Sequence, residues 1–84
     1  MNVQAGIARA IELAGGSEAK LGERIGFSQV AINKAKHRGS VSAEMALALH
    51  HFTSGEVPAS GLRPDLWNSP DDVPLAPEQE RAAS

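Results

Sequence analysis

The stretch GERIGFSQVAINKAKHRG, residues 22–39, constrains this chain most, because its glycines limit each helical segment to about two or three turns. Gly readily adopts the left-handed conformation that ends a helix. We therefore expect Gly26 to close a helix capped by Ser17, and Gly39 to close one capped by Ser28. Helices this short are not stable alone. The two segments must be held in place by packing against each other and against the rest of the chain.

Apolar residues recur at three- and four-residue spacing on both sides of this stretch, which predicts amphipathic helices. The first helix should run from about Asn2 to Ala14, and another should follow the N-cap residue Ser42. Their apolar stripes are formed by Val3, Ile7, Ile11 and Ala14, and by Met45, Ala48, Leu49 and Phe52. Pro64 limits any helix in LRPDLW to about one turn. We expect an all-α fold, a compact bundle of about five short helices.

The central pair of segments has the spacing of a helix-turn-helix, in which two short helices cross steeply at a turn containing Gly. Such a crossing requires a small residue four positions before the turn glycine and a branched apolar residue six positions after it. Gly22, Gly26 and Ile32 meet these demands. Phe27, just before the cap, and Ile32 also have the spacing of a hydrophobic staple. Together these features predict a helix-turn-helix.

The third helix should have one apolar side and one polar side. Ala31, Ile32 and Ala35 point inward, and the opposite side carries Ser28, Gln29, Asn33, Lys34 and His37. A helix fits the major groove, where an amide side chain can both donate to and accept from an adenine edge. Gln29 and Asn33 are therefore candidate base readers. Val30 suits a thymine methyl and Lys34 a guanine or a phosphate, whereas Lys20, Lys36 and Arg38 are candidate phosphate contacts.

Each of these residues also has a simpler interpretation. Taken by composition alone, Gln29 and Asn33 fit an ordinary solvated helix surface better than a binding site. Lys36 and Arg38 lie where the helix dipole favours cations, so they are candidates for capping the helix end as well as for contacting phosphate. For Gln29 and Asn33 the surrounding motif favours DNA contact, and for Lys36 and Arg38 both roles stay open.

Three motifs within residues 10–67 resemble a known family: AIELAGG, IGFSQVAINK and LRPDLW. They are similar to the Cro/repressor-type helix-turn-helix proteins of the YdaS group, found in prophages and toxin–antitoxin-like operons. The resemblance implies a lambda repressor/Cro-like bundle that binds double-stranded DNA through its third helix as a homodimer on an inverted repeat. It implies base contacts by Ser28, Gln29, Val30, Asn33, Lys34 and His37. Family members usually carry Ala at position 22 and a large apolar residue at position 35, so we expect Gly22 and Ala35 to loosen the packing between the motif helices.

Composition changes after Trp67 and divides the chain in two. With 84 residues the chain suits one small domain, which we place at residues 1–67 as the helix-turn-helix DNA-binding domain. Residues 68–84 contain three Pro, an acidic bias and no hydrophobic period, which predicts a flexible acidic tail. The net charge is -2, but residues 17–40 carry five cations against two carboxylates. The acidic tail therefore hides a basic central segment in the net charge of the chain. Only charges within a Debye length of about 8 Å act strongly on a ligand, so the local excess of cations matters more than the net charge.

Other function classes find little support in the sequence. The adjacent His50 and His51 would point about 100° apart on a helix, and the chain has no Cys, so we expect no metal site and no cofactor. Asp71 and Asp72 lack the fixed environment that a catalytic carboxylate needs, so we expect no enzyme and no small-molecule substrate. No apolar run suits a membrane span and no secretory signal is visible. We expect a cytoplasmic protein, bacterial and nucleoid-associated or phage-encoded.

The function that these observations predict is a sequence-specific DNA-binding transcriptional regulator, a repressor on an inverted-repeat operator. One such domain reads too few base pairs for useful specificity, so a homodimer is expected. Leu62, Leu66 and Trp67 either close the core under the first helix, which we favour for Trp67, or meet a second subunit. The alternative is a protein-interaction module, in which the bundle holds a partner helix and the acidic tail imitates DNA.

Overall fold

The computed structural model of the chain describes residues 2–73, and all regular secondary structure in this range is helical. The expected all-α fold is thereby confirmed. The elements are α1 (Val3–Ala14), α2 (Glu18–Ile25), α3 (Gln29–Arg38), α4 (Ala43–Phe52), α5 (Ala59–Leu62) and the 3-10 turn η1 (Pro70–Asp72).

The ends of the first four helices follow from local chemistry. One side-chain oxygen at each N-terminus accepts a hydrogen bond from the backbone N–H three residues later; the capping residues are Asn2, Ser17, Ser28 and Ser42. Gly26 and Gly39 end α2 and α3 with φ values of 78° and 70°. These values lie in the left-handed region that Gly adopts without strain. The helix bounds predicted from capping residues and glycines are therefore confirmed for α2 and α3.

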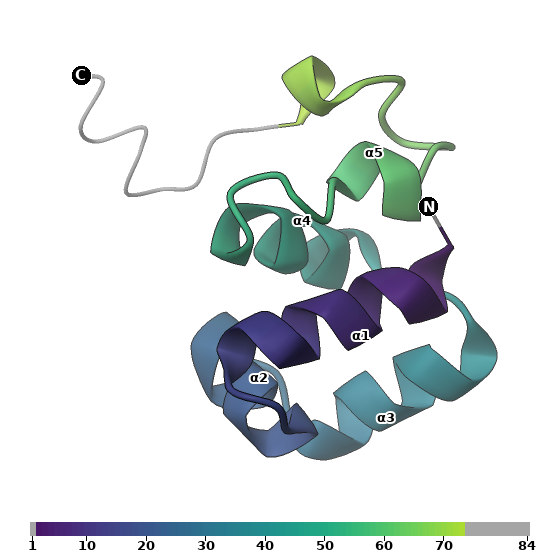
Figure 1. Cartoon of the computed structure of the whole chain (residues 1–84). Coiled ribbons are helices and arrows are strands. Elements are labelled where there is room, and N and C mark those ends of the chain that lie inside the picture. Colours follow the sequence, from purple (N-terminus) through teal and green to yellow (C-terminus); the bar gives the residue numbers. More distant parts are fainter. Residues whose placement is uncertain (1, 74–84) are drawn as a thin grey trace.

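Helix α1 occupies the centre of the bundle and contacts each of the other four α-helices. In Figure 1, α2 and α3 lie on one side of it and α4 and α5 on the other, with η1 beyond α5. Helix α1 supplies the fully buried Ile7, from its apolar stripe, and Ala10. The core continues through Leu21, Ile32, Ala35, Val41, Met45, Ala46, Leu49, Val57, Ala59 and Leu62. One core thus connects the α2–α3 pair to the α4–α5 pair.

The described chain continues past Trp67. Trp67 is half-buried and packs against the core, as favoured from the sequence, while Leu66 is exposed. The 3-10 turn η1 contacts α5, and Val73 is only 9% exposed and belongs to the core cluster. Residues 68–73 of the expected tail therefore take part in the folded unit. The remainder of that expected tail, residues 74–84, lies outside the described residues.

Thr53 fixes the turn that follows α4. The residue is 8% exposed. Its hydroxyl donates to the carbonyl oxygen of Leu49 at 2.8 Å and accepts from the N–H of Val57 at 2.9 Å. The second bond satisfies a backbone donor that burial removes from water, and it places Val57 in the core. One hydroxyl therefore connects the end of α4 to the segment that leads into α5.

We expect Thr53→Val to lower the free energy of unfolding by about 1–3 kcal/mol, because the Val57 N–H would stay buried without an acceptor. Thr53→Ser keeps the hydroxyl and is the matched control, with a smaller loss. Urea denaturation followed by far-UV circular dichroism measures both. Equal stability of the Val variant and the unmodified chain would contradict this role for the hydroxyl.

Candidate nucleic-acid interface

The turn between α2 and α3 depends on an unusually close backbone approach at Gly22. Its carbonyl oxygen accepts from the N–H groups of Gly26 at 2.8 Å and Phe27 at 3.1 Å. A Cβ placed on Gly22 would overlap the carbonyl oxygen of Phe27. The expectation that Gly22 loosens the motif is therefore wrong, because its missing side chain lets the turn fold back tightly against α2. Ile32, almost fully buried, packs beside Gly22, as the helix-turn-helix interpretation requires.

Ala35 does not loosen the α2–α3 crossing either. It is buried, and the space beside its small side chain opens toward the N-terminus of α4. The crossing of α2 and α3 is thus held by Gly22 and Ile32, and the arrangement is consistent with a helix-turn-helix.

Helix α3 turns the polar side predicted from the sequence to solvent. Ile32 and Ala35 face the core. The six predicted base-contacting residues are all exposed: Ser28, Gln29, Val30, Asn33, Lys34 and His37. Val30 is 62% exposed, the highest value among the large apolar side chains of residues 2–73. Helix α3 lies at the outer edge of the bundle in Figure 1, so within the described fold its face is accessible to a large partner.

Two of these side chains already make contacts. The Ser28 hydroxyl oxygen accepts from the N–H of Ala31 as the N-cap of α3, which leaves its O–H as a donor. The Asn33 amide Nδ2 donates to the Glu18 carboxylate at 3.4 Å, a long and exposed hydrogen bond. Glu18 was not singled out as a site residue from the sequence. Its position beside Asn33 results from the crossing of the two helices, which no spacing along the chain reveals.

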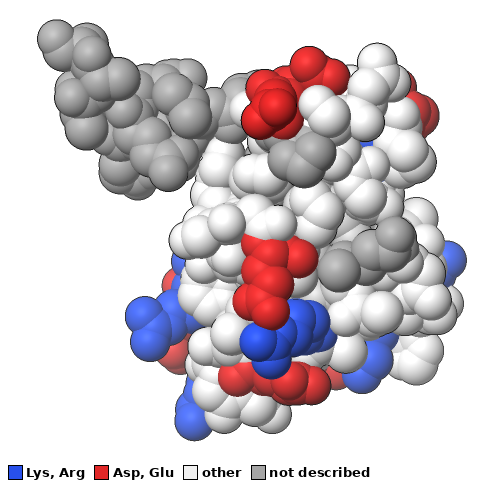
Figure 2. Space-filling view, turned by 45° about the horizontal axis from the view of Figure 1, so that its top comes forward, with Lys and Arg blue, Asp and Glu red and all other residues white. Residues whose placement is uncertain are grey.

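The predicted phosphate contacts come from two helices: Lys20 lies on α2 with its side chain beside Gly15, and Lys36 and Arg38 lie in the last turn of α3. Lys20 and Arg38 are exposed, and Lys36 is partly buried. Within the described residues none of the three, nor Lys34, forms an ion pair; the ion pairs join Arg9 to Glu12 and Glu56, and Arg63 to Asp65. In Figure 2 most Lys and Arg side chains lie in the lower half of the view, interleaved with acidic ones, while acidic side chains dominate the top. The α3 side therefore offers cations that have no partner among the described residues.

Gln4 connects α1 to the end of α3. Its amide Nε2 donates to the carbonyl oxygen of Lys36 at 3.1 Å. This bond satisfies one of the carbonyl groups that the end of a helix leaves without an intrahelical partner. It was not anticipated from the sequence, because the two residues are 32 positions apart.

A family comparison now bears on this geometry. The family model described as "Bacterial toxin YdaS" matches residues 7–70. The chain belongs to this family. The match covers α2, the turn and α3 together with the elements that support them, and it confirms the resemblance seen in the sequence. No significant match emerges among curated proteins or among solved structures. Among residues 2–73 of this YdaS-family chain, no helix has the length and apolar character that crossing a lipid bilayer requires.

The paired histidines have a structural use in this YdaS-family fold. His50 Nδ1 accepts from the N–H of Ala59 at 3.1 Å, where α5 begins. The His51 ring lies edge-on to it, with ring centroids 5.6 Å apart. Burial lowers the pKa of His50, and repulsion from His51 lowers it further. The neutral ring is therefore the form that the fold favours. No group of three or more potential metal ligands occurs among residues 2–73.

We expect Gly22→Ala to lower the free energy of unfolding by about 1–3 kcal/mol, because the new methyl group would collide with backbone. Helix propensity alone predicts the opposite sign, a gain of about 0.5–1 kcal/mol. Thermal and urea denaturation decide between them. A stabilised variant would show that the turn accommodates a methyl group, and the close approach would then not be what fixes α3.

We expect the stability of the chain to fall as pH drops below the ordinary histidine pKa of about 6.5. The unfolded chain takes up a proton there that folded His50 resists, so the contribution of His50, complete above that value, is lost as pH falls towards its lower folded pKa. His50→Asn keeps an acceptor near Nδ1 and cannot titrate. Urea denaturation across pH should show a shallower acid-side decline for this variant. Identical profiles would contradict a lowered pKa at His50.

Proposed function

We propose that this chain is a DNA-binding regulator of the prophage or toxin–antitoxin type, and that α3 reads the major groove. The observation that carries the proposal is the exposed face of α3, which presents amides and cations from a helix whose inner side is locked by Gly22 and Ile32. Family membership supports the same function.

The side chains on α3 suit direct readout. Gln29 and Asn33 are one turn apart on the same helix, about 6 Å along its axis. That distance is close to two base-pair steps at about 3.4 Å each, so the two amides can address nearby base pairs. Lys36 and Arg38 lie in the last turn of α3 and Lys20 lies on α2, and we assign all three to phosphate contacts. Their contacts would supply affinity without sequence information.

We propose further that two copies act together as a repressor. A single α3 contacts few base pairs, and a two-fold pair would place two α3 helices in successive major grooves about 34 Å apart. An inverted-repeat operator follows from that symmetry. Bound over a promoter in the bacterial cytoplasm, such a dimer would block polymerase without needing a cofactor or an enzymatic step. A mobility shift on DNA from upstream of the gene, fading as salt rises, is the first test.

We expect Gln29→Ala and Asn33→Ala each to weaken binding to the cognate site by about 1–3 kcal/mol, because each removes a bidentate base contact. Binding to random DNA should hardly change. The cognate site comes from selection of bound fragments from a random pool, and fluorescence titrations then measure both affinities. Asn68→Ala, a change to an exposed amide far along the chain, is the matched control. Equal losses on cognate and random DNA for Asn33→Ala would refute its assignment.

Lys36→Ala should behave differently. Losing a phosphate contact weakens binding to every sequence and lowers the slope of log K against log salt by about one. Titrations of selected and random DNA over a range of salt measure this slope. An unchanged slope would contradict a phosphate contact and would leave Lys36 only its role as a cation near the C-terminal end of α3.

A further inference from the structure

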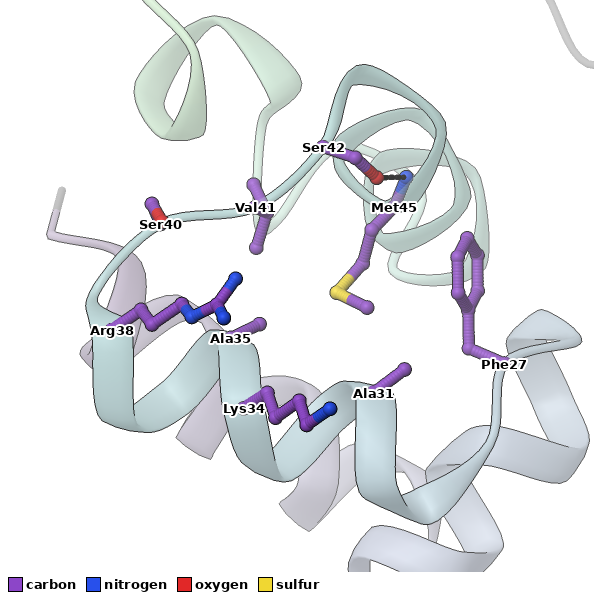
Figure 3. Close-up of a pocket in the computed structure, with 9 residues that line it drawn as sticks. All are labelled: Phe27, Ala31, Lys34, Ala35, Arg38, Ser40, Val41, Ser42 and Met45. Atoms are coloured by element: carbon purple, nitrogen blue, oxygen red, sulfur yellow. Dashed lines mark hydrogen bonds between the residues drawn. The ribbon is translucent and has the colours of Figure 1, made fainter.

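A groove of about 380 Å³ lies between the second half of α3 and the start of α4. Figure 3 shows its lining: the Phe27 ring and the Met45 side chain on one side, with Ala31 and Ala35 facing them from α3. Lys34 and Arg38 extend along its edge. The remaining lining residues are Ser40, Val41 and Ser42. The groove therefore has an apolar floor and a cationic edge.

The groove exists because α3 and α4 do not pack directly on each other. Among the described elements α3 contacts α1 and α2, whereas α4 contacts α1, α2 and α5. The two α3 residues that face α4 across the gap are both alanines, Ala31 and Ala35. Because their side chains are short, they do not fill the gap, and the Met45 thioether forms part of the floor of the groove. Flexible Met side chains suit surfaces that accommodate an inserted apolar group.

The edge of the groove is set up for negative charge. Lys34 and Arg38 are one turn apart on α3, about 6 Å along its axis. Neither forms an ion pair with any described residue, and none of the nine lining residues is acidic. Complementary charges beside an apolar contact provide both orientation and faster association.

We propose that this groove binds an acidic segment of a partner protein, which inserts one Leu- or Phe-sized side chain against Ala35 and Met45. Two carboxylates of that segment would pair with Lys34 and Arg38. An aliphatic or aromatic anchor flanked by charge is a usual core-and-rim arrangement for a small interface.

A second copy of this chain fits the groove less well. Two exposed leucines of residues 2–73 have an acidic neighbour in sequence, Leu13 next to Glu12 and Leu66 next to Asp65. Both of those carboxylates are already paired, with Arg9 and with Arg63. The other large exposed apolar side chain, Val30, has no acidic neighbour. The cations at the groove edge are therefore better matched by a different protein.

Occupation of the groove has a consequence that rests on the proposed DNA binding. Lys34 is a predicted base contact and Arg38 a predicted phosphate contact, so the partner segment and DNA would compete for the same two cations. Each ligand would weaken the other by the same factor. The partner would thereby release the regulator from its operator.

Amide NMR spectra of the full chain, without DNA, test the groove. The probe is a short helical peptide with one Phe and two Glu that are one turn apart, the spacing of Lys34 and Arg38; the control peptides replace Phe with Ala, or Glu with Gln. We expect the probe to shift the amides of Phe27, Ala31, Ala35 and Met45. Ala35→Leu and Ala31→Leu fill the groove and should weaken binding at least about tenfold, or 1.4 kcal/mol. Ala8→Leu, on the exposed side of α1, is the matched control and should change nothing.

The proposal is overturned if the amide chemical shifts do not change at millimolar concentrations of the probe peptide. It is overturned too if Ala31→Leu and Ala35→Leu, once shown to be folded, bind the peptide as tightly as the unmodified chain. It is also overturned if the same amides shift with protein concentration, which assigns the groove to a second copy. Spectra of the Leu75→Ala variant and of the unmodified chain, both without peptide, provide a further comparison. If the same amides differ between them, the groove belongs to the chain's own residues 74–84, and the proposal is overturned as well. Peptide binding without any DNA binding would refute the proposed function alone. DNA binding without peptide binding would refute the groove alone.

Discussion

The approach of the Phe27 carbonyl to the backbone of Gly22 determines most of what this chain presents to solvent. At that point the turn folds back on α2, and the Gly22 carbonyl accepts both N–H groups of the turn. The next residue, Ser28, then caps α3 in a fixed direction. Ile32 follows as the buried contact between the helices. The polar face of α3 is thus oriented by a contact in which none of the six predicted base-contacting side chains takes part.

Local chemistry is what the sequence predicts well here. Ser17, Ser28 and Ser42 act as N-caps, and Gly26 and Gly39 as helix ends, because a cap requires only residues within one turn. The inward side of each helix followed from apolar spacing for the same reason. Ile7 and Leu49 were placed in the core from periodicity, and both are fully buried. The exposure of Gln29 and Asn33 follows directly from the burial of Ile32 and Ala35.

The features that sequence reasoning missed all depend on contacts between distant residues. Glu18 meets Asn33 because two helices cross, and Gln4 reaches Lys36 because α1 lies along α3. Val73 joins the core from a stretch rich in Pro and acidic residues, where composition alone favours a tail. The groove beside Ala35 needs a small residue on α3 and a separation between α3 and α4 at the same place. Periodicity reports neither a crossing angle nor a gap.

The contact between Glu18 and Asn33 bears on how an acidic chain can select one DNA sequence. If α3 reads DNA as proposed, a carboxylate on its exposed face repels every phosphate backbone and weakens binding to all sequences. On non-specific DNA, where affinity consists only of phosphate contacts, nothing would offset this repulsion. On the cognate site of the proposed regulator, Asn33 would replace its long hydrogen bond to Glu18 by a bidentate pair with an adenine. Glu18 would then be free to accept from a cytosine amine, which would offset the repulsion there. Specificity is a difference between affinities, and a repulsive element raises it as effectively as an attractive one. The modest number of cations around α3 is therefore compatible with selective binding, provided that the amides supply the discrimination.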